Sequence, residues 1–352
     1  MRAERAERSC FGVGFIVLDV IHVSQSHGSS QEWFAGGSCG NVLAILAFLG
    51  WQSSVAARLG RDWAGGQLLA DLHRWDVATD LVTEEKGIDT PIVFQEIYRT
   101  KGGQTTHKFS RHCPICGSPK PRYRPLLKTQ AAQLSLELPR TSVFYFDRVS
   151  PSSLELARLS NSRGSMVVFE PSGIKDEALF RECLASSHIV KYSRDRLSDI
   201  ARLTDHSDIL IEIQTLGSAG LRVRTREEHA LGSWLQLPSV QSDVLRDAAG
   251  SGDWCTAGLI DAMVATGIGV GELSSHADVF TALRRGQSMA ALNCAYEGAR
   301  GLMYAMSRDD LESALTRTAM LDYARVPSVH QDRSGATETH STGCAVCGLL
   351  CD

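Results

Sequence analysis

The stretch Asp247-Ala-Ala-Gly250-Ser-Gly252-Asp253 decides how the rest of the sequence is interpreted. A run of small, helix-compatible residues follows it at once, and its two glycines free the backbone for a tight turn before that run. A helix that begins after such a turn exposes unpaired N–H groups, which hold an anion well. The pattern therefore predicts an anion-binding helix N-terminus, with Asp253 either as a functional acid or as an ordinary N-cap.

Four other segments carry related signals in chain order. They are Gly14 to Asp19, Gly36-Gly37-Ser-Cys-Gly-Asn41, Arg58-Leu-Gly60-Arg-Asp62 and Thr215-Leu-Gly217-Ser-Ala-Gly220. Together with the first stretch they resemble, in family order, the motifs of the ribokinase-like (PfkB) carbohydrate kinases. The family pattern Asp-Thr-x-Gly-Ala-Gly-Asp is matched except that Ala248 replaces the usual Thr. No Gly-x-x-x-x-Gly-Lys-Ser/Thr occurs, so the sequence does not support a P-loop kinase.

The resemblance implies an α/β fold, with a central, mostly parallel sheet flanked by helices and a small β lid. The lid would be built from residues of about 20–35 and 90–112, and a cysteine-containing insertion over 110–125 would follow it. Short apolar strands that alternate with helix-length segments independently favour βαβ units and a parallel sheet. We expect a kinase domain over 1–326 and a polar tail over 327–352.

Local patterns predict four further elements. The apolar run 11–23 predicts one buried strand, and the polar, Gly/Ser-rich segment 24–32 predicts a turn or loop. Residues 90–98 and 105–109 predict a hairpin across a Lys-Gly-Gly turn. Residues 280–304 predict a single helix.

The resemblance also assigns roles in the transfer of phosphate from ATP to a hydroxyl of a small sugar or sugar-like substrate. Asp253 would accept the proton of the attacking hydroxyl through its carboxylate. The N–H groups of Gly250, Ser251, Gly252 and Asp253 would stabilise the transferring phosphate. Substrate hydroxyls would be held by Asp19, Gly37 and Asn41. The nucleotide would be bordered by Asp247, Thr215, Gly217 and Gly220.

One segment departs from the family pattern, which carries Asn-x-x-Glu after a strand to organise Mg²⁺ and phosphate. Ser193 stands in place of the Asn and Arg196 in place of the Glu, while the usual Asp after the middle strand appears as Glu170. An Arg can contact phosphate, but it cannot help to hold the water shell of a metal. The resemblance still implies ATP and Mg²⁺. Two alternatives stay open: a nucleoside kinase, and a catalytically silent sensor with a kinase fold.

Two Cys-x-x-Cys-Gly turns form a second group of candidate ligands. Cys113-Pro-Ile-Cys116-Gly117 and Cys344-Ala-Val-Cys347-Gly348 together supply the four sulfurs of a structural Zn²⁺ site. A redox pair or an iron–sulfur cluster would use the same residues, although neither turn opens a thioredoxin-like strand–helix step. Cys351 would be a spare thiol.

Charge and hydropathy limit the partners. With 36 basic and 40 acidic residues the net charge is −4, which argues against a general nucleic-acid binder. One loop is rich in basic residues, and the simplest interpretation is a solvated surface. Two alternatives stay open: a site for an anion, and a nucleic-acid-binding protein stabilised by zinc. The basic residues of the loop are Arg111, His112, Lys120, Arg122 and Arg124. No stretch reaches the roughly 18 apolar residues of a membrane span, and we expect a cytoplasmic protein without a signal peptide. The resemblance implies a homodimer through the lid.

Overall fold

The computed structural model of the chain describes residues 8–25, 28–99, 105–138, 140–198, 200–205, 207–227, 230–265, 276–320, 325–326 and 347. Apart from Cys347, the predicted tail lies outside the described residues, and this includes Cys344 and Cys351. No described helix is long and apolar enough to cross a membrane.

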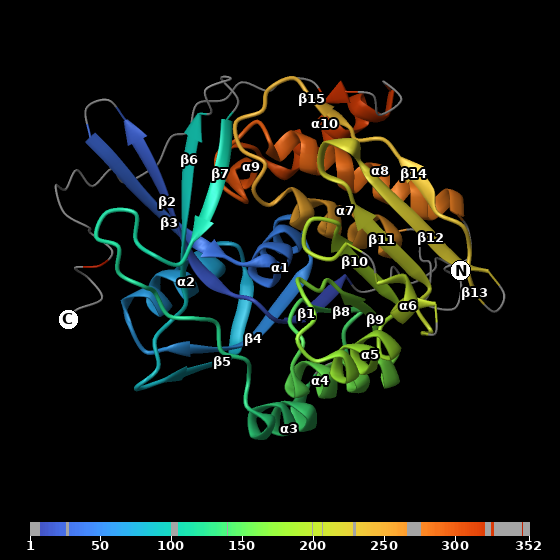
Figure 1. Cartoon of the computed structure of the whole chain (residues 1–352), viewed down its shortest axis with the longest axis horizontal. Coiled ribbons are helices and arrows are strands. Elements are labelled where there is room, and N and C mark those ends of the chain that lie inside the picture. The colour runs from blue at the N-terminus through green and yellow to red at the C-terminus, as the bar shows by residue number, and fades with distance from the viewer. Residues whose placement is uncertain are drawn as a thin grey trace.

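A central sheet of ten strands organises the described residues. Its strands are β1 (Ser9–Val13), β4 (Gln52–Gly60), β5 (Val77–Glu85), β8 (Val143–Phe146), β9 (Met166–Phe169), β10 (Ile189–Ser193), β11 (Ile211–Thr215), β12 (Leu221–Glu227), β13 (Ala230–Leu231) and β14 (Leu235–Leu237). They lie in the order β13–β12–β11–β10–β9–β8–β1–β4–β5, with β14 beside β12 (Figure 1). All neighbours from β11 to β5 are parallel, whereas β12 pairs antiparallel with β11, β13 and β14. The predicted fold class is confirmed.

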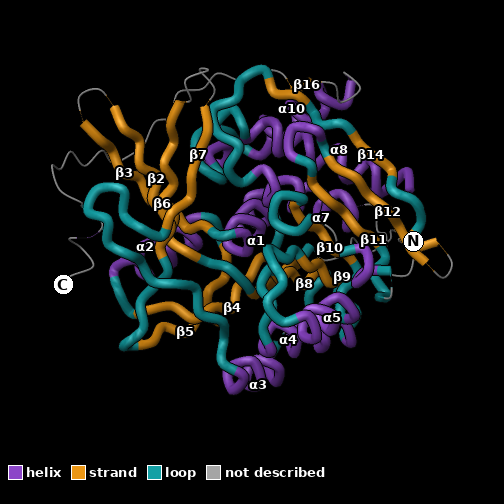
Figure 2. Tube along the Cα trace, in the orientation of Figure 1, coloured by secondary structure: helices purple, strands orange, loops and turns teal. Residues whose placement is uncertain are grey.

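Helices cover both faces of this sheet (Figure 2). They are α1 (Ser38–Phe48), α2 (Trp63–Arg74), α3 (Lys128–Glu137), α4 (Pro151–Ser162), α5 (Glu177–Ala185), α6 (Ala201–Thr204), α7 (Ser251–Ala265), α8 (His276–Asn293), α9 (Gly301–Ala305) and α10 (Arg308–Met320). One core buries α1 and α7 through residues such as Ile45 and Leu259. The other lies under α4 and α5, where the rings of Phe146 and Phe169 stack with centroids 4.4 Å apart.

A second, four-stranded sheet stands beside the first, at the upper left of Figure 1. It consists of β2 (Val17–Gln25), β3 (Gly28–Gly36), β6 (Ile92–Arg99) and β7 (Thr105–Ser110), in the order β3–β2–β6–β7. The antiparallel pairing of β6 with β7 confirms the predicted hairpin. The loop predicted over 24–32 is wrong for its described residues, because 24–25 belong to β2 and 28–32 to β3, while residues 26 and 27 lie outside the described residues. Polar composition misleads here, since an antiparallel sheet tolerates polar residues on one face.

Two other predicted elements are interrupted. The single strand over 11–23 is wrong: β1 ends at Val13 and β2 begins at Val17 in the other sheet. A Cβ on Gly14 would lie 1.9 Å from Asp147 Oδ1, so the chain bends at a point where no side chain fits. The helix over 280–304 is also wrong, because α8 ends at Asn293 and α9 begins at Gly301. Between them, Gly298 adopts a φ of +82° and donates its N–H to Asp247.

The short pair β15 (Gln241–Ser242) and β16 (Arg325–Val326), which the sequence did not predict, is parallel and separate from both larger sheets.

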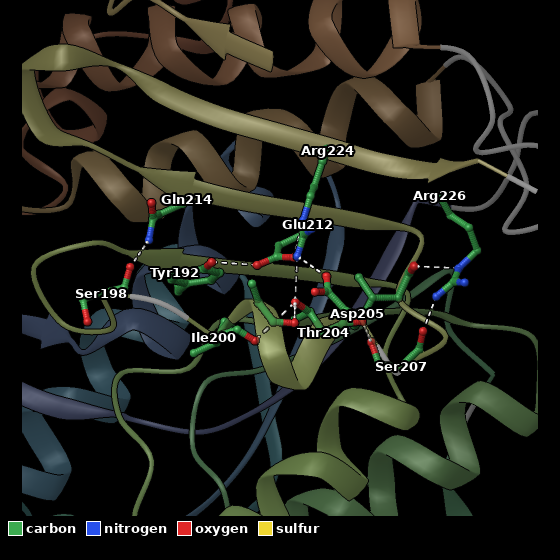
Figure 3. Close-up of polar contacts among 12 residues, drawn as sticks. Tyr192, Ser198, Ile200, Thr204, Asp205, Ser207, Glu212, Gln214, Arg224 and Arg226 are labelled. Carbon is green, nitrogen blue, oxygen red and sulfur yellow. Dashed lines mark hydrogen bonds and ion pairs between the residues drawn. The ribbon is translucent and has the colours of Figure 1, made fainter. Parts of the chain in front are cut away.

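A buried ionic network braces the antiparallel side of the main sheet (Figure 3). Glu212 of β11 is fully buried and accepts hydrogen bonds from Tyr192 of β10 at 2.6 Å and Arg224 Nε of β12 at 2.9 Å. Arg224 also pairs with Asp205 at 2.8 Å and donates to Thr204 Oγ1 at 3.1 Å, at the end of α6. The network therefore fixes β11 relative to both neighbouring strands.

Replacing Glu212→Ala should lower the free energy of unfolding by about 3 kcal/mol or more, because it leaves a largely buried guanidinium without its main partner. Denaturant unfolding followed by circular dichroism measures this change. Glu177→Ala is the matched control, since Glu177 pairs with Arg181 and Arg202 on an exposed helix face. Exposed pairs contribute little. Equal losses in the two variants would contradict the structural role of Glu212.

Candidate active site

Polar residues gather at the carboxyl ends of neighbouring parallel strands. Asp147 follows β8, Glu170 follows β9, Ser193 ends β10 and Thr215 ends β11. Asp253 lies in the first turn of α7, across from them. Ligands of open α/β sheets bind outside the carboxyl ends of the strands, so this edge is the candidate active site.

Asp253 and Asn41 join the N-termini of two helices. Asn41 Nδ2, in the first turn of α1, donates to Asp253 Oδ2 at 2.7 Å. Both side chains are buried, with Asp253 9% exposed. Because α7 begins at Ser251, Asp253 lies inside the helix and is not its N-cap. The contact brings together two residues that the sequence predicted for the site, from positions 212 residues apart.

The surroundings of Asp253 disfavour its charged form. Burial raises its pKa to about 7, and the nearby Glu170 carboxylate acts in the same direction. The hydrogen bond from Asn41 and the positive charges of Lys191 and Arg196 oppose the increase in pKa. A carboxyl group with a pKa near neutrality is suited to exchange a proton at physiological pH.

Lys191 is a buried cation that the sequence reasoning missed. Its side chain is 1% exposed, and Nζ donates to Glu170 Oε1 at 2.5 Å and to the Gly252 carbonyl at 3.1 Å. Burial is the largest influence and acts to lower the pKa of Lys191, but the charge and hydrogen bond of Glu170, together with the nearby Cys255 and Asp253, outweigh it, so the pKa is raised. Thr256 of α7 donates to Glu170 Oε2 at 2.7 Å. These contacts fix the start of α7 against β9 and β10. The sequence signal that could have identified Lys191 is the presence of a lysine within the apolar strand Ile189–Ser193.

The glycine turn before α7 is held from several sides. Gly250 has a φ of +74°, and a Cβ there would lie 2.1 Å from the Ala299 carbonyl oxygen, so only glycine fits. Asp247 accepts from Ala249 N at 2.9 Å, from Gly298 N at 2.9 Å and from Gln95 Nε2 at 2.5 Å. Asp247 therefore ties the turn to β6 of the small sheet and to the segment between α8 and α9.

A small pocket, partly open to solvent, lies between the small sheet, α1 and the segment after α8. Residues that line it include Asp19, Phe34, Asn41, Gln95, Arg300 and Tyr304. The structure thus brings the predicted substrate residues Asp19 and Asn41 to one pocket. Gly37, the residue before α1, has a φ of +79°, and a Cβ there would lie 2.2 Å from the Phe15 carbonyl oxygen.

Asp19 is the second acid of this pocket. Burial raises its pKa to about 7; Arg300 acts to lower the pKa, the charge of Asp253 raises it, and a hydrogen bond from Gly37 N–H lowers it. A Cβ on Gly36 would lie 1.9 Å from Asp19 Oδ2, so the glycine leaves room for the carboxylate. Asp19 and Asp253 are therefore coupled through space.

Arg300 is the second residue that the sequence reasoning missed, and it lines the pocket. It is 3% exposed, and Nη2 contacts Asp71 Oδ2 at 2.5 Å and the Ala35 carbonyl. Within the described part of the chain, Arg300 Nη1 and Asn41 Oδ1 are buried without a hydrogen-bond partner. Buried polar groups are normally paired, so these two atoms offer one donor and one acceptor to a ligand. The sequence analysis expected a continuous helix through Gly298 and Arg300, so it gave no reason to place Arg300 in a binding site.

Of the residues predicted to border the nucleotide, Asp247 belongs to the glycine turn before α7, whereas Thr215, Gly217 and Gly220 lie at and after the end of β11. Gly217 and Gly220 adopt φ values of +61° and +96° after Thr215, and a Cβ on Gly220 would lie 2.2 Å from the Leu237 carbonyl oxygen. Ser193 Oγ accepts from Asp195 N at 3.3 Å, whereas Arg196 is exposed. These residues border the strand ends on the side of Glu170.

Three of the four predicted metal ligands meet outside the pocket. Ligand atoms of Cys113, Cys116 and Cys347 lie within 4.8 Å of one another, and Cys344 is outside the described residues. Hydrogen bonds, above all from Ser118, lower the pKa of Cys116 to about 6.

Comparison with known proteins gives structural matches only. No protein-family model and no curated protein sequence matches the chain. Fructokinase from Xylella fastidiosa with bound ATP matches with a TM-score of 0.68 and 16% identity, over 89% of this chain and 99% of that one. Ribokinase from Giardia lamblia gives 0.66 and 16%, over 89% and 99%.

Aminoimidazole riboside kinase from Salmonella enterica, complexed with aminoimidazole riboside and an ATP analogue, matches with a TM-score of 0.64 and 20% identity, over 87% of this chain and 99% of that one. These matches and the strand order define the fold as ribokinase-like, the fold of these sugar and nucleoside kinases. The fold that the sequence motifs suggested is thereby confirmed.

Asp253→Asn should stabilise the ligand-free protein at pH 8, by on the order of 2 kcal/mol. The folded-state pKa of about 7 exceeds the ordinary value of 3.8, so ionisation costs stability as pH rises from about 4 through 7. The gain should shrink at pH 5 and vanish below pH 4. Denaturant unfolding at these pH values measures it, and a variant less stable than wild type at pH 8 would contradict the burial argument.

Proposed function

We propose that the protein is an ATP-dependent kinase that transfers the γ-phosphoryl group to a hydroxyl of a small sugar or sugar-like acceptor. The observation that carries the proposal is the buried carboxylate of Asp253, which lies three residues after Gly250 and accepts a hydrogen bond from Asn41, a residue that lines the pocket. Phosphoryl transfer needs an acceptor hydroxyl positioned in line with the phosphate and electrostatic neutralisation of that phosphate. The pocket that Asn41 lines would hold the acceptor hydroxyl, and the helix N-terminus that contains Asp253 would neutralise the phosphate.

Asp253 would accept the proton of the attacking hydroxyl. Its pKa of about 7 leaves much of it ionised at neutral pH, and the conjugate acid is stable enough to keep the proton while the new O–P bond forms. Asn41 orients the carboxylate through Oδ2, and Lys191 keeps α7 in place through the Gly252 carbonyl. In this account Lys191 and Asn41 position the base.

The N-terminus of α7 would stabilise the transferring phosphate. The first N–H groups of a helix lack intrahelical partners and carry the positive end of its dipole. In α7 these are the groups of Ser251, Gly252 and Asp253, after the turn at Gly250. The Ser251 N–H makes only a long bond of 3.3 Å to the Ala248 carbonyl, which phosphate could replace.

The acceptor would bind in the pocket through complementary hydrogen bonds. A hydroxyl can donate to Asn41 Oδ1 and accept from Arg300 Nη1, the two buried atoms that lack partners among the described residues. Asp19 would accept from a second hydroxyl beside Gly37. The positive charge of Arg300 is already offset by its ion pair with Asp71, which leaves the negative charge of Asp19 to act on a ligand in the pocket. The pocket therefore favours an uncharged polyol over an anion.

ATP would lie along the ends of β10 and β11, bordered by Thr215, Gly217 and Gly220 as in the sequence-based expectation. Mg²⁺ would neutralise charge on the phosphates. Glu170, the carboxylate that follows β9, is engaged by Lys191 and Thr256, and Ser193 and Arg196 replace the family's Asn and Glu. We therefore propose that the ion is held by phosphate oxygens and water. No step of this reaction involves the cysteine cluster.

Two alternatives have specific support. Solved structures with this fold include a nucleoside kinase from Burkholderia thailandensis in complex with inosine, matched at 16% identity, so a nucleoside acceptor is the second candidate. The Ser193 and Arg196 replacements support the third, a ligand-binding protein without turnover. The lid function of the small sheet, a homodimer through it and a cytoplasmic location remain predictions.

Release of ADP from ATP–Mg²⁺ should be stimulated by one member of a panel of sugars and nucleosides. Asp253→Asn should reduce kcat at least about a hundredfold, because the amide cannot accept the proton. For wild type, kcat/KM should fall as pH decreases through about 7, where Asp253 and Asp19 become protonated.

Matched controls separate the outcomes. Asp205→Asn changes an acid in the Figure 3 network that is not among the residues lining the pocket, and it should leave the pH profile intact. If no acceptor stimulates turnover although calorimetry detects ATP binding, the kinase proposal fails and the silent ligand-binding protein replaces it. Unchanged turnover in Asp253→Asn would remove Asp253 as the base.

A further inference from the structure

The cysteine cluster is built by two segments that are far apart in the sequence. Cys116 Sγ and Cys347 Sγ are 3.4 Å apart although 231 residues separate them, and Cys113 completes the group of three. Cys113 is 2% exposed, and Cys347 packs against the core that contains it. Isolated buried cysteines act as small apolar residues, but three converging thiols indicate a shared ligand.

The backbone around Cys113 has the form of a metal-binding knuckle. Gly117 N–H donates to the Cys113 carbonyl at 2.9 Å, and Cys113 N–H donates to the Ser118 carbonyl at 2.9 Å. Gly117 adopts a φ of +72°, which favours glycine at this position. A bridge between His112 and Pro119 closes the base of the turn. The turn therefore presents both of its thiols to one shared position.

We propose that this cluster binds one Zn²⁺ through Cys113, Cys116, Cys347 and Cys344. Zn–S bonds of about 2.3 Å place the sulfurs of a tetrahedral site about 3.8 Å apart. The sulfurs here, 3.4 Å apart for one pair and within 4.8 Å for all three, need only small shifts to reach that spacing. Cys344 is chosen because Cys344-Ala-Val-Cys347-Gly348 repeats the spacing of the first turn.

Ser118 provides a polar partner for the sulfurs. Its Oγ lies 3.2 Å from Cys116 Sγ and 3.4 Å from Cys347 Sγ. Hydroxyl groups that hydrogen-bond to ligand atoms orient the first coordination sphere of metal sites. A disulfide accounts for the arrangement less well, because it would join two of the sulfurs and leave the third unused.

The ion would crosslink the end of the chain to the segment that follows β7. That segment continues to Tyr123, whose ring packs edge-on against Phe15 with centroids 5.8 Å apart. Phe15 in turn donates its N–H to Asp147 at 2.7 Å. A crosslink between such distant positions removes conformational freedom from the unfolded chain, so the metal would contribute to folding rather than to the chemistry.

The test uses the full chain, purified anaerobically with a reductant, and measures bound metal and folding independently of any kinase activity. Wild type should contain one Zn²⁺ per chain. Cys113→Ser, Cys347→Ser and Cys344→Ser should each weaken retention against a competing chelator at least about tenfold. Cys351→Ser, in the same tail, is the matched control and should retain zinc as wild type does.

Wild type alone gives a second readout in case a variant fails to fold. After the metal is stripped, titration with Co²⁺ should produce thiolate-to-cobalt absorption that saturates at one equivalent and is abolished by Zn²⁺. Folded wild type with no zinc and no cobalt absorption, or with iron and acid-labile sulfide instead, would overturn the proposal. Retention in Cys344→Ser together with loss in Cys351→Ser would overturn the assignment of Cys344.

Discussion

The contact between Asn41 and Asp253 is the constraint on which the site depends. It holds the N-termini of α1 and α7 together, and with them the pocket on one side and the glycine turn on the other. A carboxylate in this position is costly because it is largely removed from water. The raised pKa of Asp253 expresses that cost, and it is also the property a general base requires near neutral pH.

Surrounding contacts keep this arrangement in one conformation. The Glu170–Lys191 pair ties α7 to the strand ends, and Asp247 ties the glycine turn to the small sheet and to the loop after α8. The Glu212 network braces β10, β11 and β12, and the ends of β10 and β11 would border the nucleotide in the proposed function. If Asp253 is the base of the proposed function, these contacts would hold it in place, and binding energy need not be used to assemble it.

Much of the fold and part of the site could be predicted from local sequence signals. Glycine turns have strong local requirements, so Gly37, Gly250 and Gly220 marked their positions correctly, each with a positive φ. The break between β1 and β2 depends on the approach of Asp147, and Lys191 and Arg300 matter through partners distant in sequence. Such effects appear only once the chain is folded. The Ser193 and Arg196 replacements were visible in sequence, but their consequence depends on how Mg²⁺ is held.

The most direct test of Asp253 as a prepared base is a carbon-13 NMR titration of its carboxyl group in the ligand-free protein. Selective aspartate labelling, with Asp253→Asn to assign the signal, makes the residue observable. The account predicts a midpoint near pH 7, with a second aspartate, Asp19, in the same range. A midpoint near the ordinary value of 3.8 would show a solvated carboxylate and would contradict the account of a desolvated base at the start of α7.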